Sequence, residues 1–257
     1  MSIATALQNR AEAAQTLKTL STLPANLVDA IAGETEGNTE YLARRIASLA
    51  FAGRDASALV VELSARQNSD GGFGGGPGYD SNALDTGWAL IALKSAKAFA
   101  AVSPALGYLI LAQASDGSYS AAGRSDVEST AVVVLALGLY ASQFESFAAI
   151  SRAVLYLLAQ RTPAGQWGNS AFLTATVYAA IHDVVPLEPT TTAVRGFLTA
   201  RQGADGSWDN GDPFSTSLAL RGVRPIRCRA PPRPARSNSG TSSPVPIRCS
   251  FRSISTA

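Results

Sequence analysis

The stretch "VRGFLTARQGADGSW", residues 194–208, joins an apolar helical segment to a loop that holds two glycines, an aspartate and a tryptophan. Close relatives of this loop occur upstream at 67–73, 113–119 and 160–167, and the four segments are called the repeat loops below. Their last residues are aromatic and are spaced 46, 48 and 41 residues apart: Phe73, Tyr119, Trp167 and Trp208. A period of this size predicts a chain built from repeated structural units.

Each repeat loop has the residues of a turn between two helices. Gly supplies backbone freedom after Asp, and the aromatic side chain is expected to pack against the next unit. In three loops a Gln lies four residues before the Gly, where it can hydrogen-bond free backbone groups at the next helix end. In the loop that starts at Gln160, Arg161 occupies the position four residues before the glycine, Gly165. The residues of this structural motif are Gln67, Gly71, Phe73, Gln113, Gly117, Tyr119, Gly165, Trp167, Gln202, Gly206 and Trp208.

A second feature keeps nearly the same period. A threonine near the start of the segment after each loop recurs at intervals of 44, 44 and 42 residues: Thr86, Thr130, Thr174 and Thr216. Thr39 is a weaker fifth match, 47 residues before Thr86. The segments that hold these threonines are apolar nearly all round, which is typical of a helix buried on every face. The segments before the loops are apolar on one face, so each unit is predicted to pair an outer helix with an inner one.

This pattern predicts an all-α fold of about five helical hairpins. The expected outer segments lie near 4–20, 56–67, 103–113, 149–161 and 190–202, each followed by an inner helix. The fifth inner helix is expected to start at Phe214 and to stop around Val223, which would leave the ring incomplete. Because repeat arrays need polar terminal units for solubility, we expect open ends to cause self-association.

The residues quoted at the outset resemble the QW motif of the squalene–hopene cyclase and prenyltransferase β-subunit superfamily. Seven residues match that motif in order: Arg195, Gly196, Phe197, Leu198, Gln202, Gly206 and Trp208. The resemblance covers residues 1–222 and implies an α/α toroid, in which helical hairpins form a ring around an apolar cavity.

The chemistry of that superfamily matches this sequence less well. The D-x-D-D acid motif of triterpene cyclases is not found, and "DNGD" at 209–212 has the wrong spacing. Residues 1–222 contain no Cys and only His182, so an Asp/Cys/His zinc site or a Cys-Gln thioester cannot be built there. We therefore expect no catalytic residue, metal or cofactor, and a non-catalytic scaffold or binding module that is a fragment of a larger protein. The alternative is a terpene cyclase- or prenyltransferase-like enzyme whose usual motifs are missing.

Six carboxylates are predicted at the starts of inner helices, near the mouth of the cavity: Asp80, Asp85, Asp126, Glu128, Asp209 and Asp212. Paired carboxylates could perform acid–base chemistry, but helix capping also explains them and is the favoured interpretation. Trp88, Phe172 and Phe214 are candidates for the cavity lining or for the core. The glycine-rich segment 70–80 is interpreted as a flexible loop, since the strand and Lys of a phosphate loop are missing.

The two ends of the chain differ in charge. Residues 1–222 hold 14 Lys+Arg against 19 Asp+Glu, whereas 223–257 hold seven Arg, no acid and both Cys. The second segment is predicted to be a disordered basic tail, and we favour a frameshift or truncation product over a basic arm.

Partners are less well defined by the sequence. An apolar or lipid-like molecule or a protein segment is expected at the inner wall, and no nucleic acid at residues 1–222. The sequence lacks a recognisable signal peptide or membrane span, which places it in the cytoplasm by default and outside the cell if a longer protein carries it.

Overall fold

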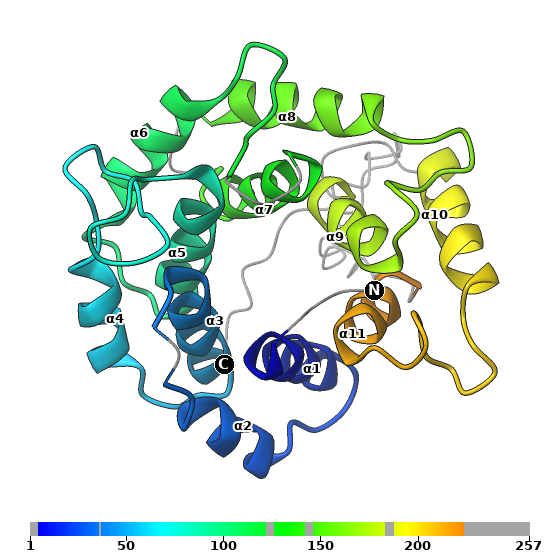
Figure 1. Ribbon diagram of the computed structural model, residues 1–257, viewed down its shortest axis with the longest axis horizontal. Coiled ribbons are helices and arrows are strands. Elements are labelled where there is room, and N and C mark those ends of the chain that lie inside the picture. The colour runs from blue at the N-terminus through cyan, green and yellow to red at the C-terminus, as the bar shows by residue number, and fades with distance from the viewer. Residues whose placement is uncertain (1–4, 36, 122–125, 142–145, 183–187, 224–257) are drawn as a thin grey trace, which may run out of the picture.

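The computed structural model describes residues 5–35, 37–121, 126–141, 146–182 and 188–223, and in these ranges it contains eleven α-helices and no strand. The helices form two concentric layers (Figure 1). The inner layer consists of α1 (Ala6–Leu20), α3 (Thr39–Phe51), α5 (Ala83–Ser95), α7 (Asp126–Gly138), α9 (Ala171–Ile181) and α11 (Pro213–Val223). The outer layer consists of α2 (Ala25–Ala32), α4 (Ser57–Ser64), α6 (Val102–Ala112), α8 (Phe147–Ala159) and α10 (Glu188–Ala200). The predicted all-α toroid is confirmed.

The inner layer closes on itself. Each inner helix contacts the next one along the chain, and α11 contacts α1 (Figure 1). At this junction the Thr16 hydroxyl donates to the carbonyl of Ser217 at 2.9 Å. Five outer–inner pairs are present, but the interpretation of segment 4–20 as an outer helix is wrong, because α1 is the sixth member of the inner ring. The expected open arc of inner helices is therefore wrong as well.

The two repeated features of the sequence are hydrogen-bonded to each other. The backbone amide of the aromatic residue donates to the threonine hydroxyl of the following inner helix. The four distances run from 2.8 to 3.1 Å, in the pairs Phe73–Thr86, Tyr119–Thr130, Trp167–Thr174 and Trp208–Thr216. The four aromatic side chains are buried. Each loop is thus fixed to the start of an inner helix by one polar contact and one buried ring.

The glutamines connect each loop to the next outer helix. Gln67 Nε2 donates to the carbonyls of Gly71 and Ala101, both at 2.8 Å, and Ala101 directly precedes α6. Gln113 Nε2 donates in the same way to Gly117 at 3.0 Å and to Ala149 of α8 at 2.9 Å. Neighbouring units are therefore joined by side-chain hydrogen bonds to the backbone, which do not depend on the identity of the partner residue.

Arg161 makes the corresponding connection in the third repeat loop. Its Nη1 donates at 2.8 Å to the hydroxyl of Thr190 in the first turn of α10. A guanidinium therefore replaces the amide of the other loops, and the partner changes from a carbonyl to a hydroxyl. The contact between units is kept although the residue differs.

The glycines of the loops have backbone conformations that other residues rarely adopt. Gly71, Gly117, Gly165 and Gly206 have φ between +82° and +90°. A Cβ on Gly117 would also lie 2.4 Å from the carbonyl oxygen of Arg152. Both the turn and the approach of the next helix therefore require glycine there.

A buried ionic cluster holds α1 between its neighbours. Arg44 of α3 donates to Glu12 of α1 at 2.6 Å and to Glu40 at 2.9 Å, and Glu12 also pairs with Arg221 of α11. Gln8 Nε2 donates to Glu40 at 2.9 Å. This cluster spans three consecutive helices of the ring, so it joins the first inner helix to the last.

The protonation of Glu12 follows from these contacts. Burial alone would raise the pKa of its carboxyl, but Arg221 and Arg44 outweigh burial and hold the pKa below the ordinary 4.5. A carboxyl with a lowered pKa stabilises the fold fully above its ordinary pKa, and this contribution is lost as the pH falls through the lowered value. The α1–α11 junction is therefore sensitive to acid.

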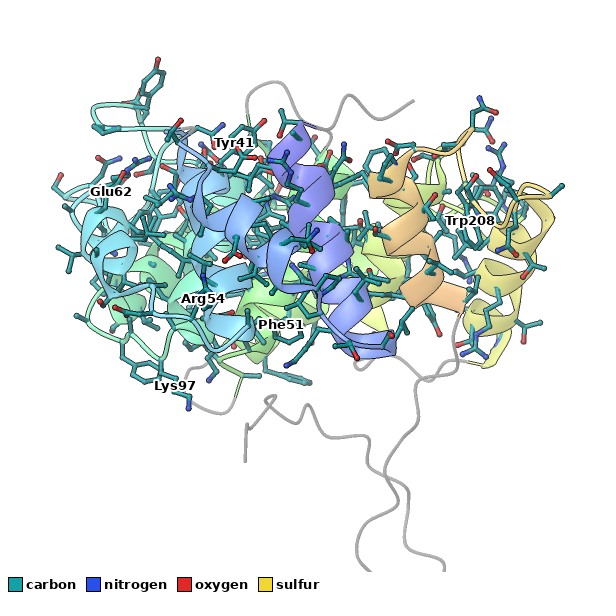
Figure 2. All side chains as sticks on the ribbon, turned by 90° about the horizontal axis from the view of Figure 1, so that it is seen from below. Tyr41, Phe51, Arg54, Glu62, Lys97 and Trp208 are labelled. Atoms are coloured by element: carbon teal, nitrogen blue, oxygen red, sulfur yellow. The ribbon has the colours of Figure 1, made fainter. Side chains whose placement is uncertain are left out.

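The inner helices begin at one end of the toroid, which is called the N-terminal rim below. Figure 2 shows the molecule from the side, with Tyr41 of the first turn of α3 toward this rim. Phe51 at the end of α3, Arg54 and Lys97 lie toward the opposite end. The repeat loops precede the inner helices and so belong to the N-terminal rim.

The glutamine contacts predict unequal effects of the same substitution. Gln113→Ala removes three bonds that join a loop to α8, namely the one donated to Ala149 and the two accepted from Arg152, together with the bond to Gly117 within the loop. It is expected to lower the free energy of unfolding by about 2 kcal/mol. Within the described residues, Gln202→Ala removes only the bond to Gly206 and should cost less than about 0.5 kcal/mol, since Gln202 is exposed. Urea unfolding followed by circular dichroism measures both, and equal losses would contradict a joining role for Gln113.

The ionic cluster predicts a second effect. Glu12→Gln leaves Arg221 and one side of Arg44 without a charged partner and should lower stability at pH 7 by about 3 kcal/mol. The stability of the variant should also fall less steeply than that of the wild type as the pH drops below 4.5. Thermal unfolding between pH 3 and 7 tests this, with Glu62→Gln, half-exposed on α4, as the matched control. Parallel acid profiles for Glu12→Gln and the wild type would exclude Glu12 as the group responsible.

Candidate functional site at the N-terminal rim

A pocket of about 750 Å³ opens at the N-terminal rim, between the starts of α3 and α5. Its size falls in the range of small-molecule sites. The glycine-rich loop forms one wall, and α6 and the loop before α7 complete it. The lining residues are Asn38, Glu40, Gly75, Tyr79, Asp80, Ser81, Asn82, Ala83, Leu84, Asp85, Tyr108, Ala112, Ser120 and Ala121.

Hydrogen bonds brace the glycine-rich loop that forms this wall. Asn68 Nδ2 donates to the Tyr79 carbonyl at 3.0 Å and to the Ser81 hydroxyl at 2.9 Å, and Ser81 donates to Asp70 at 2.8 Å. A Cβ on Gly74 would lie 2.4 Å from the Tyr79 carbonyl oxygen. The loop therefore folds back tightly on itself, and its interpretation as a flexible connection is wrong.

The first turn of α5 places one carboxylate in the pocket. Asn82 caps this helix by accepting the backbone amide of Asp85 at 2.9 Å, and its Nδ2 donates to Asp85 Oδ2 at 2.6 Å. The backbone amide of Asn82 donates to the Phe73 carbonyl at 3.0 Å, which connects the helix start to the repeat loop. Asp85 is half-buried, so its carboxyl is held in position while it faces the pocket.

The described residues of the pocket carry negative charge. Three carboxylates line it, and among the described lining residues there is no Lys, Arg or His. Glu40 is buried and bound by Arg44 and Gln8, so its charge is compensated from below the pocket. Asp80 is exposed and Asp85 half-exposed. The described part of the lining therefore offers carboxylates and no cation to a ligand.

Tyr108 supplies a hydroxyl-bearing ring to the same wall. Burial, with a smaller contribution from the charge of Asp70, raises the pKa of its phenol. The phenol therefore stays protonated at neutral pH and can act as a hydrogen-bond donor toward a ligand.

The structure places only two of the six predicted mouth carboxylates in this pocket, namely Asp80 and Asp85. Asp126 and Glu128 lie in the first turn of α7, outside the lining. Asp212 caps α11 by accepting the Ser215 amide at 2.9 Å, and Asp209 lies in the turn before it with φ +50°. Four of the six therefore lie at other inner helices of the rim.

The three aromatic candidates lie deeper in the ring. Phe172 and Phe214 are in tilted contact with centroids 5.9 Å apart. The Arg44 guanidinium stacks 3.8 Å from the Trp88 ring and lies 5.7 Å from the Phe214 ring. Because α5 and α11 are not neighbours in the ring, these contacts place the guanidinium on its inner side. The inner wall was expected to be apolar, but it carries the buried charge of Arg44 among its aromatic rings. None of the three rings is among the described residues that line the pocket.

His182 lies at the C-terminal end of α9 and contacts its own helix. One ring nitrogen is 2.9 Å from the Ala179 carbonyl, and the ring lies 5.8 Å from that of Tyr178. Across the described ranges, no group of three His, Cys, Asp or Glu side chains is arranged to hold a metal ion. In the same part of the chain, no helix is long and apolar enough to cross a membrane. The predicted basic tail lies outside the described residues.

Several residues of the site were not singled out from the sequence. Asn38, Glu40, Tyr79, Asn82 and Tyr108 come from four separate segments, and none of them belongs to the repeat motif. One signal was available for Asn82, since an Asn three residues before an Asp at a helix start is a capping pattern. Glu40 offered only its i,i+4 spacing to Arg44, since its other partner, Gln8, lies 32 residues away in the sequence.

Comparison with known proteins identifies the fold. No family model matches the chain. The drimenyl diphosphate synthase of Streptantibioticus cattleyicolor is 27% identical over 187 residues, which cover 64% of this chain and 35% of that protein. The ent-copalyl diphosphate synthase from Streptomyces platensis superposes with a TM-score of 0.68 at 20% identity, over 84% of this chain and 49% of that one.

A second solved structure is similar over nearly its full length. The type II terpene cyclase MstE from Scytonema, in complex with geranylgeranyl dihydroxybenzoate, gives a TM-score of 0.69 at 16% identity, with 84% of this chain and 86% of that chain covered. The chain spans between about a third and a half of the two diphosphate synthases. The resemblance inferred from the repeat loops is confirmed, and the chain has the α/α-toroid fold of the type II terpene cyclases.

Proposed function

We propose that this chain is a terpene cyclase-like domain that takes the uncharged end of an isoprenoid chain into the rim pocket and protonates a double bond there. The observation that carries the proposal is the pocket itself, which presents Asp85 to a space of about 750 Å³ on a toroid shared with type II terpene cyclases. The similar proteins are named for isoprenoid substrates or products, which supports this substrate class.

The charge of the pocket supports the orientation of the substrate. A diphosphate would meet the carboxylate of Asp80, with no Lys, Arg or His among the described lining residues, and like charges repel at close range. The hydrocarbon end carries no charge and avoids this repulsion. The isoprenoid is therefore expected to enter tail first, with any anionic group outside the pocket.

Asp85 is the proposed acid because of its place in the helix. The protonated carboxyl would give its proton to one alkene carbon, leaving a carbocation on the other and a carboxylate on Asp85. The Asn82 side-chain amide and the backbone dipole at the start of α5 would stabilise the carboxylate that is left after proton transfer. Loss of a proton from the carbocation, or attack by water followed by loss of a proton from that water, would complete the reaction, and the released proton would restore the carboxyl of Asp85.

A non-catalytic binding domain is the second candidate. Arg44 fills the space among Trp88 and Phe214 on the inner side of the ring, where an aromatic surface would otherwise face a carbocation. On this hypothesis the rim pocket holds an isoprenoid group without converting it. Binding and turnover therefore have to be measured separately.

We expect cyclised products when the full chain is incubated with farnesyl or geranylgeranyl diphosphate and the extract is analysed by gas chromatography and mass spectrometry after phosphatase treatment. Asp85→Asn should lower turnover by about 100-fold or more, because it removes the proton donor and keeps the shape. The matched control is Asp126→Asn, a first-turn carboxylate of α7 outside the pocket, which should retain activity. Saturable binding without product would favour the second candidate, and neither binding nor product would contradict both.

A further inference from the structure

An Asp or Asn directly precedes a glycine at four places in the described residues, the pairs 70–71, 116–117, 205–206 and 210–211. At such a pair the backbone nitrogen of the glycine can attack the carbonyl carbon of the preceding side chain, because glycine has no side chain that shields this nitrogen. The product is a five-membered succinimide ring. The rate of the attack depends on how firmly the nitrogen and the side chain are held.

The three Asp–Gly pairs lie in repeat loops and are restrained in the same way. The glycine amide donates at 2.9 Å to the carbonyl three residues earlier, at Asn68, Ala114 and Gly203. The Asp side chain accepts the backbone amide two residues later at 2.9 to 3.0 Å, from Gly72, Ser118 and Ser207. The bonds from the two serines also hold the pKa of Asp116 and Asp205 below the ordinary 3.8. Both carboxyls are therefore ionised at neutral pH, and an ionised carboxylate resists attack by a nucleophile.

The Asn210–Gly211 pair has neither restraint. Among the residues that the structure describes, the Asn210 side chain and the Gly211 amide make no hydrogen bond, and both residues are exposed. The carboxamide of Asn210 is neutral, so no negative charge protects its carbonyl carbon. Asp209, Asn210 and Gly211 have φ of +50°, +61° and +84°, which places three consecutive residues in the left-handed region. This conformation is unfavourable at the two residues that are not glycine.

The turn that contains this pair has two fixed ends. The Asp212 amide donates to the Trp208 carbonyl at 3.1 Å, and the Trp208 amide donates to the Thr216 hydroxyl of α11 at 3.0 Å. Asp212 in turn accepts the Ser215 amide at 2.9 Å. A change in the length of the main chain between Trp208 and Asp212 therefore acts directly on the start of α11.

We propose that Asn210 is a site of spontaneous deamidation. The backbone nitrogen of Gly211 forms a bond to Cγ of Asn210, the bond from Cγ to Nδ2 breaks, and ammonia leaves with the proton of the Gly211 amide. Water then opens the succinimide at one of its two carbonyls, which gives an aspartate or an isoaspartate at position 210. The isoaspartate adds one methylene group to the main chain between the two fixed ends. Deamidation thereby loosens the first turn of α11.

The test follows the full chain by peptide mapping and mass spectrometry during incubation at pH 7 and pH 8. We expect residue 210 to be converted to both acids, and the rate to rise roughly tenfold between the two pH values, because the attacking nitrogen must lose its proton. Asn169 is the internal control, since it is also exposed but is followed by Ser170 and bound by Arg201. It should be converted at least about tenfold more slowly, the equivalent of one hydrogen bond.

Two variants separate the chemistry from its structural effect. Asn210→Gln keeps an amide but cannot close a five-membered ring, so conversion at position 210 should stop. Asn210→Asp carries the new charge without the added methylene. Relative to this variant, the purified isoaspartate form should exchange the amide hydrogens of Asp212 and Thr216 about tenfold faster, the effect of one lost hydrogen bond.

A synthetic peptide of residues 207–213 serves as the positive control, since it has the same sequence without the fold. The proposed site is excluded if Asn210 keeps its amide in the full chain while the peptide deamidates, or if Asn169 is converted as fast as Asn210. Equal exchange in the isoaspartate form and in Asn210→Asp would exclude the effect on α11. These measurements need no isoprenoid and no turnover, so their result is independent of the proposed function.

Discussion

The hydrogen bond between a loop amide and a threonine hydroxyl is the contact on which the toroid depends. It occurs four times, from Phe73 to Thr86 through Trp208 to Thr216, and each time it fixes the direction in which the chain leaves a loop and enters an inner helix. Thr39 shows what happens without the loop. Its hydroxyl is buried with no hydrogen-bond partner among the described residues, because no repeat loop precedes α3. The helix start is instead held by the bond from the Thr39 amide to the Gly75 carbonyl.

The aromatic residue at the end of each loop can vary because the amide and not the side chain makes this contact. The indoles of Trp167 and Trp208 donate to the outer helix, at Leu157 and Leu198. Tyr119 packs in the same place, but its hydroxyl is buried without a hydrogen-bond partner among the residues that the structure describes, and burial raises the pKa of its phenol. Phe73 brings no polar atom at all. The ring therefore supplies burial in every unit, and its polar atom is useful only in the two tryptophan copies.

Much of this architecture could be predicted from the sequence, because the repeat loops and the threonines of the inner helices recur with nearly the same period. The outer helices α4, α6, α8 and α10 and the start of α11 were located by that period. The first unit could not be located by that period. Its residues Gln8, Glu12 and Thr16 recur every four residues, which is typical of a solvent-exposed helix face. All three are nevertheless buried. Their partners Glu40, Arg44 and Ser217 lie up to 201 residues away, so no local pattern reveals them. The eight residues of α2 lack a repeat loop and were missed.

Closure of the ring changes how this repeat protein is expected to lose its structure. In a linear array the terminal unit has one neighbour, so unfolding can begin at an end and spread inward. Here α1 and α11 border each other, and every inner helix has a neighbour on both sides. Fraying from an end is possible only after the contacts of Glu12 and Thr16 with α11 have been broken. Among the described residues, the inner ring is therefore a repeat array without a free end, and its unfolding should be cooperative in the manner of a globular domain.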